Sequence, residues 1–380
     1  MRYLIDSKDR LVSLNEEWVA FATTNSGQGV AAESDVIGRR IWDFFSSEEL
    51  KSVYRWIFQK VRKTEQPFSL PFRCDSPSMR RMMSLEVEHQ GNGYLAITTR
   101  LDQSISRSPL SLLDVNASRT AESIDICSMC RRVNLGHNHW VEAEDIIHLP
   151  EISRTGRFPS FNERVCHDCS SQVEDLPYMV SLSGNVDKGE ESPLIVFLHG
   201  ETQGDNLFRL QAPPRLVSSH KLLDLPPFIL LSVLKHKPGP WDIEKVMTAL
   251  RETLDLYAID RRRIYITGIS SGGMAVWKLI TQYPDVFAAA VPVAANANVY
   301  MSSPAAGIKP PVWATLGGAD PVVREKTFLN GMKLLKLNRW DVKWTIFDGQ
   351  NHDCWTATYL NQDIWEWLFA QKKANPASLI

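Results

Sequence analysis

The hydrophobic pattern of residues 1–102 alternates in short runs, which predicts strands. The runs lie at residues 2–14, where a turn at residues 7–9 divides two strands, and at 68–75, 80–89 and 94–101. The last two runs are joined by Gly91-Asn92-Gly93, a strong hairpin signal. We therefore expect a mixed α+β domain in which a strand pair, helices and three antiparallel strands follow one another.

One helix is predicted between these strands, at residues 45–66. Its apolar side chains recur at intervals of three and four residues, as on one face of a helix. They are Leu50, Val53, Tyr54, Ile57, Phe58 and Val61. Ser46 and Glu49 have the spacing of a capping box, which predicts where the helix begins.

The pattern weakens in the middle of the chain and then changes character. Residues 103–122 are rich in Ser, Arg and Asn without a sustained period, so a linker is expected there. Residues 123–175 contain two C-x-x-C pairs and are expected to form a small segment of their own. From residue 190 to 375 short β-branched runs alternate with helical patterns. This alternation predicts an α/β domain with a mostly parallel sheet covered on both faces, within a multidomain chain.

Each element of this third domain is predicted from a separate run. Strands are expected at residues 193–200, 226–234, 263–268, 287–295, 310–318 and 341–347. Helices are expected at residues 242–257, 272–283 and 358–373.

Composition limits the classes of function. With 380 residues the chain is longer than one core usually supports, so two or three domains are expected. A net charge of -2 provides no bulk attraction for nucleic acid or an anionic membrane, and neither partner is expected. The N-terminus lacks the apolar core of a signal peptide, and no apolar run approaches the roughly 20 residues of a membrane span. A cytoplasmic protein is therefore expected.

Six cysteines introduce candidate metal chemistry. Cys127, Cys130, Cys166 and Cys169 form two C-x-x-C pairs, whereas Cys74 and Cys354 stand alone. Two such turns supply the four thiolates of a tetrahedral zinc site, and four cysteines leave no open position, so the zinc would be structural. Isolated reduced thiols are the alternative. His137, His139 and His167 are expected to be solvated and not to be ligands.

The stretch "GISSG" at residues 268–272 carries the candidate catalytic chemistry. It fits G-x-S-x-G and lies between a predicted strand and a predicted helix, where a sharp turn lifts the central serine above the sheet edge. Ser270 is therefore the candidate nucleophile, and the N–H of Ser271 is a candidate oxyanion donor. The N–H of Glu201, just past the strand that ends at His199-Gly200, is the second candidate donor, with an ordinary turn as the alternative.

A candidate acid and base follow in chain order. Asp320 lies just past one predicted strand and His352 just past the last, at the sheet edge where α/β active sites lie. His352 would take the proton of Ser270, and Asp320 would fix the tautomer of the imidazole. Weaker candidates are Asp260, before the nucleophile strand, and Asp348 and Asp353, which are close to His352 in sequence.

Three tryptophans near loop ends are weak candidates to line a substrate pocket, with plain packing as the alternative. They are Trp241, Trp313 and Trp355. The third domain leaves little room for a large insertion over such a pocket.

Resemblances to known families extend these expectations. The stretches "NEEWVAFA", "IWDFFSSEEL" and "PFRCDSPSMRRMMSLEV" resemble a PAS-like family of sensor domains, over nearly all of residues 1–102. Residues 123–175 are similar to the zinc-ribbon companion that follows such domains. The resemblance implies an unknown small ligand at the PAS-like domain, regulation of an attached output, and a tendency to form a homodimer.

Residues 193–373 resemble the small α/β-hydrolases that include predicted carboxylesterases, phospholipases and peptidases, relatives of dienelactone hydrolase and polyhydroxybutyrate depolymerase. The matching motifs are "VFLHGETQGDN", "PGPWD", "IDRRRIYITGISSGGMAVWKLITQYPDVFAAAVPVA", "PVWATLGGADPVV" and "NHDCWTATYLNQDIWEWL". Carried over by position, the family's triad falls on Ser270, Asp320 and His352, with no cofactor for catalysis. The chain departs from the family at Asn351, where Gly is usual, and at Leu316-Gly317-Gly318, where a His-Gly-type start is usual. Neither departure removes a proton-transfer group.

The expected function is a serine ester hydrolase of the carboxylesterase type that works through an acyl-enzyme on a small-molecule ester and is regulated by the PAS-like domain. The alternatives are a serine peptidase, and a sensor or adaptor whose hydrolase-like domain is a binding module. The complete triad favours the hydrolase, because a binding module has no need of Ser, Asp and His at all three positions.

Overall fold

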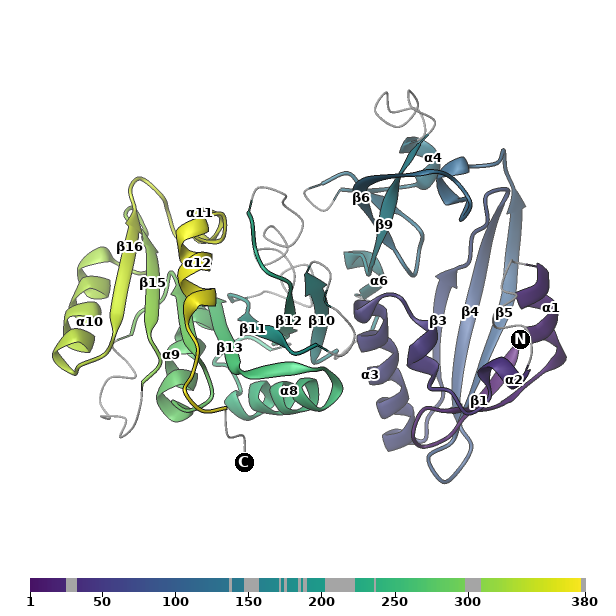
Figure 1. Ribbon diagram of the computed structural model, residues 1–380, viewed down its shortest axis with the longest axis horizontal. Helices are drawn as coiled ribbons and strands as arrows, with labels where there is room; N and C mark the ends of the chain where they lie inside the picture. The colour runs from purple at the N-terminus through teal and green to yellow at the C-terminus, as the bar shows by residue number, and fades with distance from the viewer. Residues whose placement is uncertain are drawn as a thin grey trace. The chain divides into compact units, whose positions relative to one another are not determined.

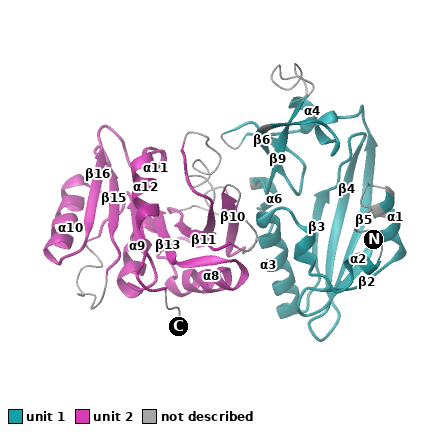
Figure 2. Ribbon diagram, viewed as in Figure 1, with its two compact units in different colours: residues 1–173 teal, residues 174–380 magenta. Residues whose placement is uncertain are grey.

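The structure, a computed structural model, divides the chain into two compact units, Met1–Val173 and Glu174–Ile380 (Figure 2). It describes residues 1–24, 33–136, 139–146, 157–170, 172–173, 176–183, 186, 190–201, 223–235, 237–297 and 309–376. Among these residues no helix combines the length and the apolar composition needed to cross a bilayer.

The first unit begins with a five-stranded antiparallel sheet in the order β2-β1-β5-β4-β3 (Figure 1). Its strands are β1 (Arg2–Ile5), β2 (Leu11–Leu14), β3 (Phe68–Arg73), β4 (Met79–His89) and β5 (Leu95–Ser106). The predicted strand pair and the later run of three strands are confirmed. At the predicted hairpin turn Gly91, Asn92 and Gly93 all have positive φ, which explains the glycines there.

The predicted helix is α3 (Glu48–Thr64), which buries the apolar side chains Val53, Ile57, Phe58 and Val61. The other helical elements of this part are α1 (Glu16–Thr24), α2 (Glu33–Val36) and the 3-10 helix η2 (Ile41–Phe44). The prediction that Ser46 and Glu49 form a capping box was wrong. Ser47 caps α3 by accepting a hydrogen bond from the Leu50 N–H at 3.2 Å.

Ser46 and Glu49, the two expected capping residues, form hydrogen bonds with residues distant in sequence instead. Ser46 Oγ hydrogen-bonds to the carboxylate of Glu163. Glu49 is 1% exposed; it accepts a hydrogen bond from the Val165 N–H at 2.8 Å and lies 3.5 Å from the Arg164 guanidinium. These groups belong to a segment more than a hundred residues away, which local spacing cannot reveal.

Residues 103–122, where a linker was expected, contain the end of β5, the 3-10 helix η3 (Ser111–Leu113) and the start of β6 (Arg119–Cys127). A second sheet follows in the order β8-β7-β6-β9. Its other strands are β7 (Val133–Asn134), β8 (Trp140–Val141) and β9 (Phe158–Arg164), and its helices are α4 (Ala143–Ile146) and α6 (His167–Ser170). Leu110, Leu112 and Leu113 pack into the core of this sheet, so the expected linker supplies core side chains.

Buried ion pairs join the second sheet to the first. The Arg73 guanidinium, 7% exposed, contacts Asp75 and lies 2.6 Å from a Glu142 carboxylate oxygen. Arg107 lies 2.5 Å from Glu144, which also pairs with Arg80 at 2.9 Å. Because desolvated charges must be paired, this network ties β3, β4 and Arg107, the residue after β5, to residues 142–144 within one unit.

The second unit contains a seven-stranded sheet in the order β10-β12-β11-β13-β14-β15-β16. The strands are β10 (Tyr178–Ser183), β11 (Ser192–Leu198), β12 (Phe228–Val233), β13 (Ile259–Ile269), β14 (Ala289–Val293), β15 (Val312–Gly317) and β16 (Val342–Phe347). All neighbouring strands are parallel except β10, which pairs antiparallel with β12. The mostly parallel sheet is confirmed, but β10 lies before residue 190, where the domain was expected to begin.

Both faces of this sheet are covered by helices, as predicted. Alternate residues of β11 point to opposite cores: Leu194 packs with α8 (Ile243–Leu256), α9 (Ser271–Gln282) and α10 (Glu325–Leu337), and Ile195 with the other face. That other face is covered by α11 (Trp355–Tyr359) and α12 (Gln362–Ala370). One helix was expected at residues 358–373, but two helices are found: α11 ends at Tyr359, and Asn361 caps the start of α12.

We expect Glu49→Ala to lower the free energy of unfolding of the first unit by about 2–4 kcal/mol, because it leaves a buried N–H and the Arg164 charge without this partner. Hydrogen exchange of residues 45–66 in the full-length chain, at increasing denaturant, measures this change. The matched control is Glu86→Ala, whose ion pair with Arg100 is largely exposed, and we expect it to lose under about 1 kcal/mol. Equal losses in both variants would contradict the assignment of Glu49.

Candidate active site

Ser270 lies at the sharp turn between β13 and α9, with φ 52° and ψ -115°. This left-handed backbone is strained for a non-glycine residue, and the surrounding contacts hold it in place. The Ser270 N–H donates to the Val293 carbonyl of β14 at 2.9 Å. A Cβ at Gly272 would lie 2.2 Å from the Leu198 carbonyl oxygen, so the turn packs directly on the end of β11. The G-x-S-x-G glycines therefore provide space for backbone, as the motif predicts.

A continuous chain of hydrogen bonds connects the three residues that the sequence selected. His352 Nε2 lies 2.9 Å from Ser270 Oγ, and His352 Nδ1 lies 2.8 Å from Asp320 Oδ2. The Asp320 side chain is fully buried, and its other oxygen accepts from the N–H groups of Val322 and Val323 at 2.8 and 2.9 Å. These backbone donors fix the carboxylate, so the imidazole is held between an acceptor and a hydroxyl.

The competing acids lie elsewhere. Asp260 is at the amino end of β13 and pairs with Arg263 at 2.7 Å, far along the strand from Ser270. Asp348 and Asp353 are exposed. Among the described acids, the structure pairs Asp320 with the His352 ring.

The loop that carries His352 packs tightly on the end of β15. A Cβ at Gly317 would lie 2.1 Å from the Asn351 carbonyl oxygen and 2.4 Å from that of Gln350. The Ala319 N–H also donates to the Gln350 carbonyl at 2.9 Å. Gly317, within the stretch Leu316-Gly317-Gly318 that departs from the resembled family, thus leaves room for the loop backbone.

Buried hydroxyl groups below this loop were missed by sequence reasoning. Thr315 of β15 and Thr358 of α11 are fully buried, and their Oγ1 atoms lie 2.9 Å apart. Thr267 of β13 hydrogen-bonds to the Tyr359 hydroxyl at 2.8 Å. These contacts attach α11, which follows His352, to the sheet. Their only sequence signal is threonine within otherwise apolar strands.

Cys354, which stood alone in the sequence, is fully buried in the same place. Burial, together with the nearby charge of Asp320, raises the pKa of its thiol to about 11. The group is therefore a neutral packing thiol at neutral pH and belongs to the support of the His352 loop.

The backbone segments that carry the two candidate oxyanion donors lie next to Ser270. Ser271 is the first residue of α9, so its N–H is at the positive end of the helix. A Cβ at Gly200 would lie 3.6 Å from the Ser270 Cβ, which places the backbone that leads into Glu201 beside the nucleophile. The His199 ring is 1% exposed and fixes this backbone, because its Nδ1 lies 2.6 Å from the Gly200 carbonyl.

The three tryptophans that were candidates for the substrate pocket lie in different places in the structure. Trp355 is half-buried, with its ring 6.4 Å from the His352 ring. Trp241 is buried against His199, with ring centroids 4.9 Å apart. Trp313 is the second residue of β15, about 13 Å along the strand from Gly317, at the opposite sheet edge from Asp320. Its Nε1 donates to Thr345 at 3.0 Å, so packing accounts for it.

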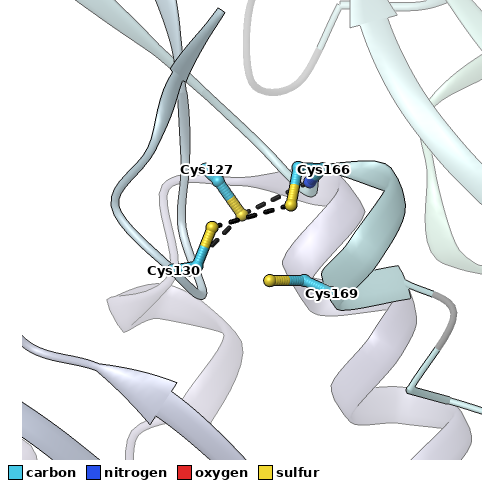
Figure 3. Close-up of side chains that lie close together, drawn as sticks. All are labelled: Cys127, Cys130, Cys166 and Cys169. Atoms are coloured by element: carbon cyan, nitrogen blue, oxygen red, sulfur yellow. Dashed lines mark hydrogen bonds between the residues drawn. The ribbon is translucent and has the colours of Figure 1, made fainter. Parts of the chain in front are cut away.

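The four paired cysteines converge at a second candidate site, in the first unit (Figure 3). Their sulfur atoms all lie within 4.8 Å of one another, and those of Cys130 and Cys166 are 3.6 Å apart. A tetrahedral zinc with bonds of about 2.3 Å needs sulfurs about 3.8 Å apart, so the donor set fits. Cys127 ends β6, whereas Cys169 lies in α6, so the two pairs come from different elements. His139 is exposed, and His137 and the His167 side chain lie outside the described residues.

Several donors point at these sulfurs. The N–H groups of Cys130 and Cys166 lie 3.5 and 3.3 Å from Cys127 Sγ, and Arg132 Nε lies 3.3 Å from Cys130 Sγ. Such donors stabilise thiolates, the form in which cysteine binds metal.

Comparisons with known proteins match the C-terminal unit. A family model described as the prolyl oligopeptidase family matches residues 230–307, which include Ser270. Feruloyl esterase B of Talaromyces stipitatus is 26% identical over 132 residues, 35% of this chain and 32% of the relative. Poly(3-hydroxyalkanoate) depolymerase C of Paucimonas lemoignei is 30% identical over 114 residues, 27% of this chain and 28% of the relative.

A solved thermostable esterase is 27% identical, with a TM-score of 0.40, and the match covers 52% of this chain and 59% of that one. The chain spans about a third of the length of the curated relatives it matches. Together with the sheet order, the family match and the curated relatives support an esterase-like α/β-hydrolase fold for the C-terminal region.

Proposed function

We propose that the second unit is a serine hydrolase that cleaves carboxylic esters through an acyl-enzyme, with Ser270 as nucleophile, His352 as base and Asp320 as the acid that orients it. The observation that carries the proposal is the unbroken series of hydrogen bonds from Ser270 Oγ through His352 to Asp320. The names of the two curated relatives, an esterase and a depolymerase, point to the same reaction class.

In the acylation step Ser270 Oγ attacks the ester carbonyl while His352 Nε2 takes the hydroxyl proton. Asp320 accepts a hydrogen bond from Nδ1–H, which holds the tautomer that leaves Nε2 free to act as base. The carbonyl oxygen becomes an oxyanion that accepts from the N–H groups of Glu201 and Ser271. The tetrahedral intermediate collapses as the C–O bond to the alcohol breaks, and His352 returns the proton to the leaving alkoxide.

Deacylation repeats these steps with water. His352 removes a proton from water, the hydroxide attacks the acyl carbonyl, and the same N–H groups stabilise the oxyanion. The bond to Ser270 Oγ then breaks, and the serine recovers its proton from His352. No metal or organic cofactor is needed in this proposal.

A panel of p-nitrophenyl esters from acetate to octanoate tests the proposal. We expect Ser270→Ala to lower kcat by roughly 10³-fold or more, as loss of a triad nucleophile does. Asp320→Asn should lose about 10⁴-fold, because an amide selects the wrong imidazole tautomer. The matched control is Asp348→Asn, an exposed acid close to His352 in sequence, which should keep native activity. Equal activity of the native chain and Ser270→Ala would overturn the assignment.

Adjacent glycines offer a second test of the site. We expect Gly317→Ala to lower kcat by about 10²-fold, because its methyl group displaces the backbone at Gln350 and Asn351 and moves His352 from Ser270. At Gly318 the nearest atom to an added Cβ is 3.4 Å away, an ordinary contact, so Gly318→Ala is the control and should stay near native. The rate of ester hydrolysis by both variants measures the difference. Similar losses of kcat in the two would contradict the role of Gly317 in placing the His352 loop.

One observation favours a second reaction class. The family model that matches residues 230–307 is described as the prolyl oligopeptidase family, so peptide bonds are the alternative substrate. The same nucleophile, base and oxyanion donors cleave either bond, and the leaving group decides. Peptide p-nitroanilides, run beside the esters, distinguish the two. A sensor or adaptor without hydrolysis remains the alternative only where both probe classes fail.

We further propose that residues 1–102 are a PAS-like sensor domain that binds a small ligand and regulates the hydrolase. The order of strand pair, helices and three antiparallel strands supports this, as does the sequence resemblance. A homodimer through this domain belongs to the same proposal.

For the second candidate site we propose a structural Zn²⁺ held by Cys127, Cys130, Cys166 and Cys169. Four thiolates fill a tetrahedral shell, so the ion would have no position for substrate and would hold β6 and α6 together. The protein contributes the backbone and Arg132 donors that stabilise the thiolates.

We expect the purified protein to contain about one Zn per chain and Cys130→Ser to lose most of it, as coordination by four thiolates requires. Cys74→Ser is the matched control, since Cys74 lies outside the cluster, and it should retain the metal. Elemental analysis of both variants, with hydrogen exchange of residues 119–134, measures occupancy and local stability. Full stability of the native chain without metal would refute the structural role.

A further inference from the structure

Glu201, whose N–H is a candidate oxyanion donor, forms an ion pair through its partly exposed carboxylate with the buried ammonium of Lys235. Lys235, just past β12, is 9% exposed, and its Nζ lies 2.7 Å from Glu201 Oε2. The same ammonium donates to the Gly239 carbonyl at 2.5 Å, and the Gly239 N–H donates to Glu201 Oε1 at 3.1 Å. Both carboxylate oxygens of Glu201 are therefore held by residues 235–239.

The backbone before Glu201 is tied to the same residue. The Lys235 N–H donates to His199 Nε2 at 3.0 Å, which puts the imidazole proton on Nδ1, where it donates to the Gly200 carbonyl at 2.6 Å. Lys235 thus contacts the segment 199–201 twice, through its main chain and through its ammonium. This segment supplies one of the two N–H groups of the proposed oxyanion site.

The negative charge of the Glu201 carboxylate, close in the chain to the backbone beside Ser270, is balanced by the Lys235 ammonium. Burial alone would raise the pKa of Glu201, but hydrogen bonds from Lys235, the Gly239 N–H and the Ser271 side chain outweigh this, and the pKa is lower than its ordinary value. Glu201 is therefore an anion at neutral pH, one residue beyond Gly200, which packs beside Ser270. A second negative charge develops there on the substrate oxygen, and two like charges repel.

We propose that Lys235 is a positioning residue for ester hydrolysis, which compensates the Glu201 carboxylate and holds the Glu201 N–H toward the developing oxyanion. The proposal rests on the hydrolase function proposed above. Lys235 acts through Glu201 and does not touch the substrate. Loss of the ammonium should therefore weaken transition-state stabilisation and leave substrate binding almost unchanged.

A double-mutant cycle in the full-length chain tests this with p-nitrophenyl esters. Lys235→Met should lower kcat by about tenfold with little change in KM, less than the 10²–10³-fold that follows loss of an oxyanion donor itself. Glu201→Gln should lose less, about threefold, because it removes the repelling charge together with the clamp. The combined variant should recover to the level of Glu201→Gln. Lys237→Met, an exposed lysine in the same loop, is the control and should match the native chain.

A merely structural Lys235 predicts a different result, since losing both partners would then be at least as harmful as losing the lysine. A combined variant no better than Lys235→Met, or a loss confined to KM, overturns the proposal. If Lys235→Met does not fold, Glu201→Gln alone carries the test: a loss in kcat of about threefold with an unchanged KM is expected, and a loss of tenfold or more, or one confined to KM, overturns the proposal.

The rate of Ser270 labelling by a fluorophosphonate separates this proposal from the hydrolase function. Phosphonylation needs the same nucleophile and oxyanion donors, so the variants should keep the order seen in kcat. Labelling of the native chain and Lys235→Met at equal rates refutes the role of Lys235 and leaves the hydrolase standing. A native chain that is neither labelled nor active refutes both.

Discussion

The active-site geometry depends on the absence of side chains where three backbone segments meet. A Cβ at Gly272 would lie 2.2 Å from the Leu198 carbonyl oxygen, and one at Gly268 would lie 2.7 Å from the Gly272 backbone. Because these segments touch directly, the turn between β13 and α9 is held in a conformation that Ser270 would not adopt alone. The same contact brings the end of β11 beside the serine, so one steric constraint sets the positions of both the hydroxyl and the nearby N–H groups.

A second close approach provides the other half of the site. Gly317 leaves room for the backbone at Asn351, and buried hydroxyls at Thr315 and Thr358 attach the following helix to the sheet. The His352 loop is thus held at two places, by its close packing on the end of β15 and by α11, which follows it in the chain. Since a shift of about 1 Å in a reacting group is enough to lose much of a rate, packing below the loop matters as much as the residues that face the substrate.

Local sequence patterns were sufficient to predict those elements whose formation depends on residues close together in the chain. Strands β11 to β16, helices α8, α9 and α12, the turn at Ser270 and the C-x-x-C pairs follow from periodicity and turn chemistry, and parallel strands bring their loops to one edge. Strand β10 and helix α10 were not predicted. Features set by distant contacts were missed. The partner of Glu49 lies more than a hundred residues away, and Trp313 pairs with Thr345 on the neighbouring strand at the edge of the sheet opposite the candidate site.

The expected linker shows most clearly what the sequence could not reveal. Leu110, Leu112 and Leu113 lie in a Ser- and Arg-rich stretch, yet they fill the core beneath the second sheet. The Arg73 N–H donates to the Met129 carbonyl between Cys127 and Cys130, and Glu49 accepts from Val165 just before Cys166. Both cysteine turns are thus hydrogen-bonded to the first sheet and its helix. Because these contacts cross the expected boundary, the proposed zinc would stabilise the packing of the N-terminal sheet, and that packing would in turn stabilise the metal site.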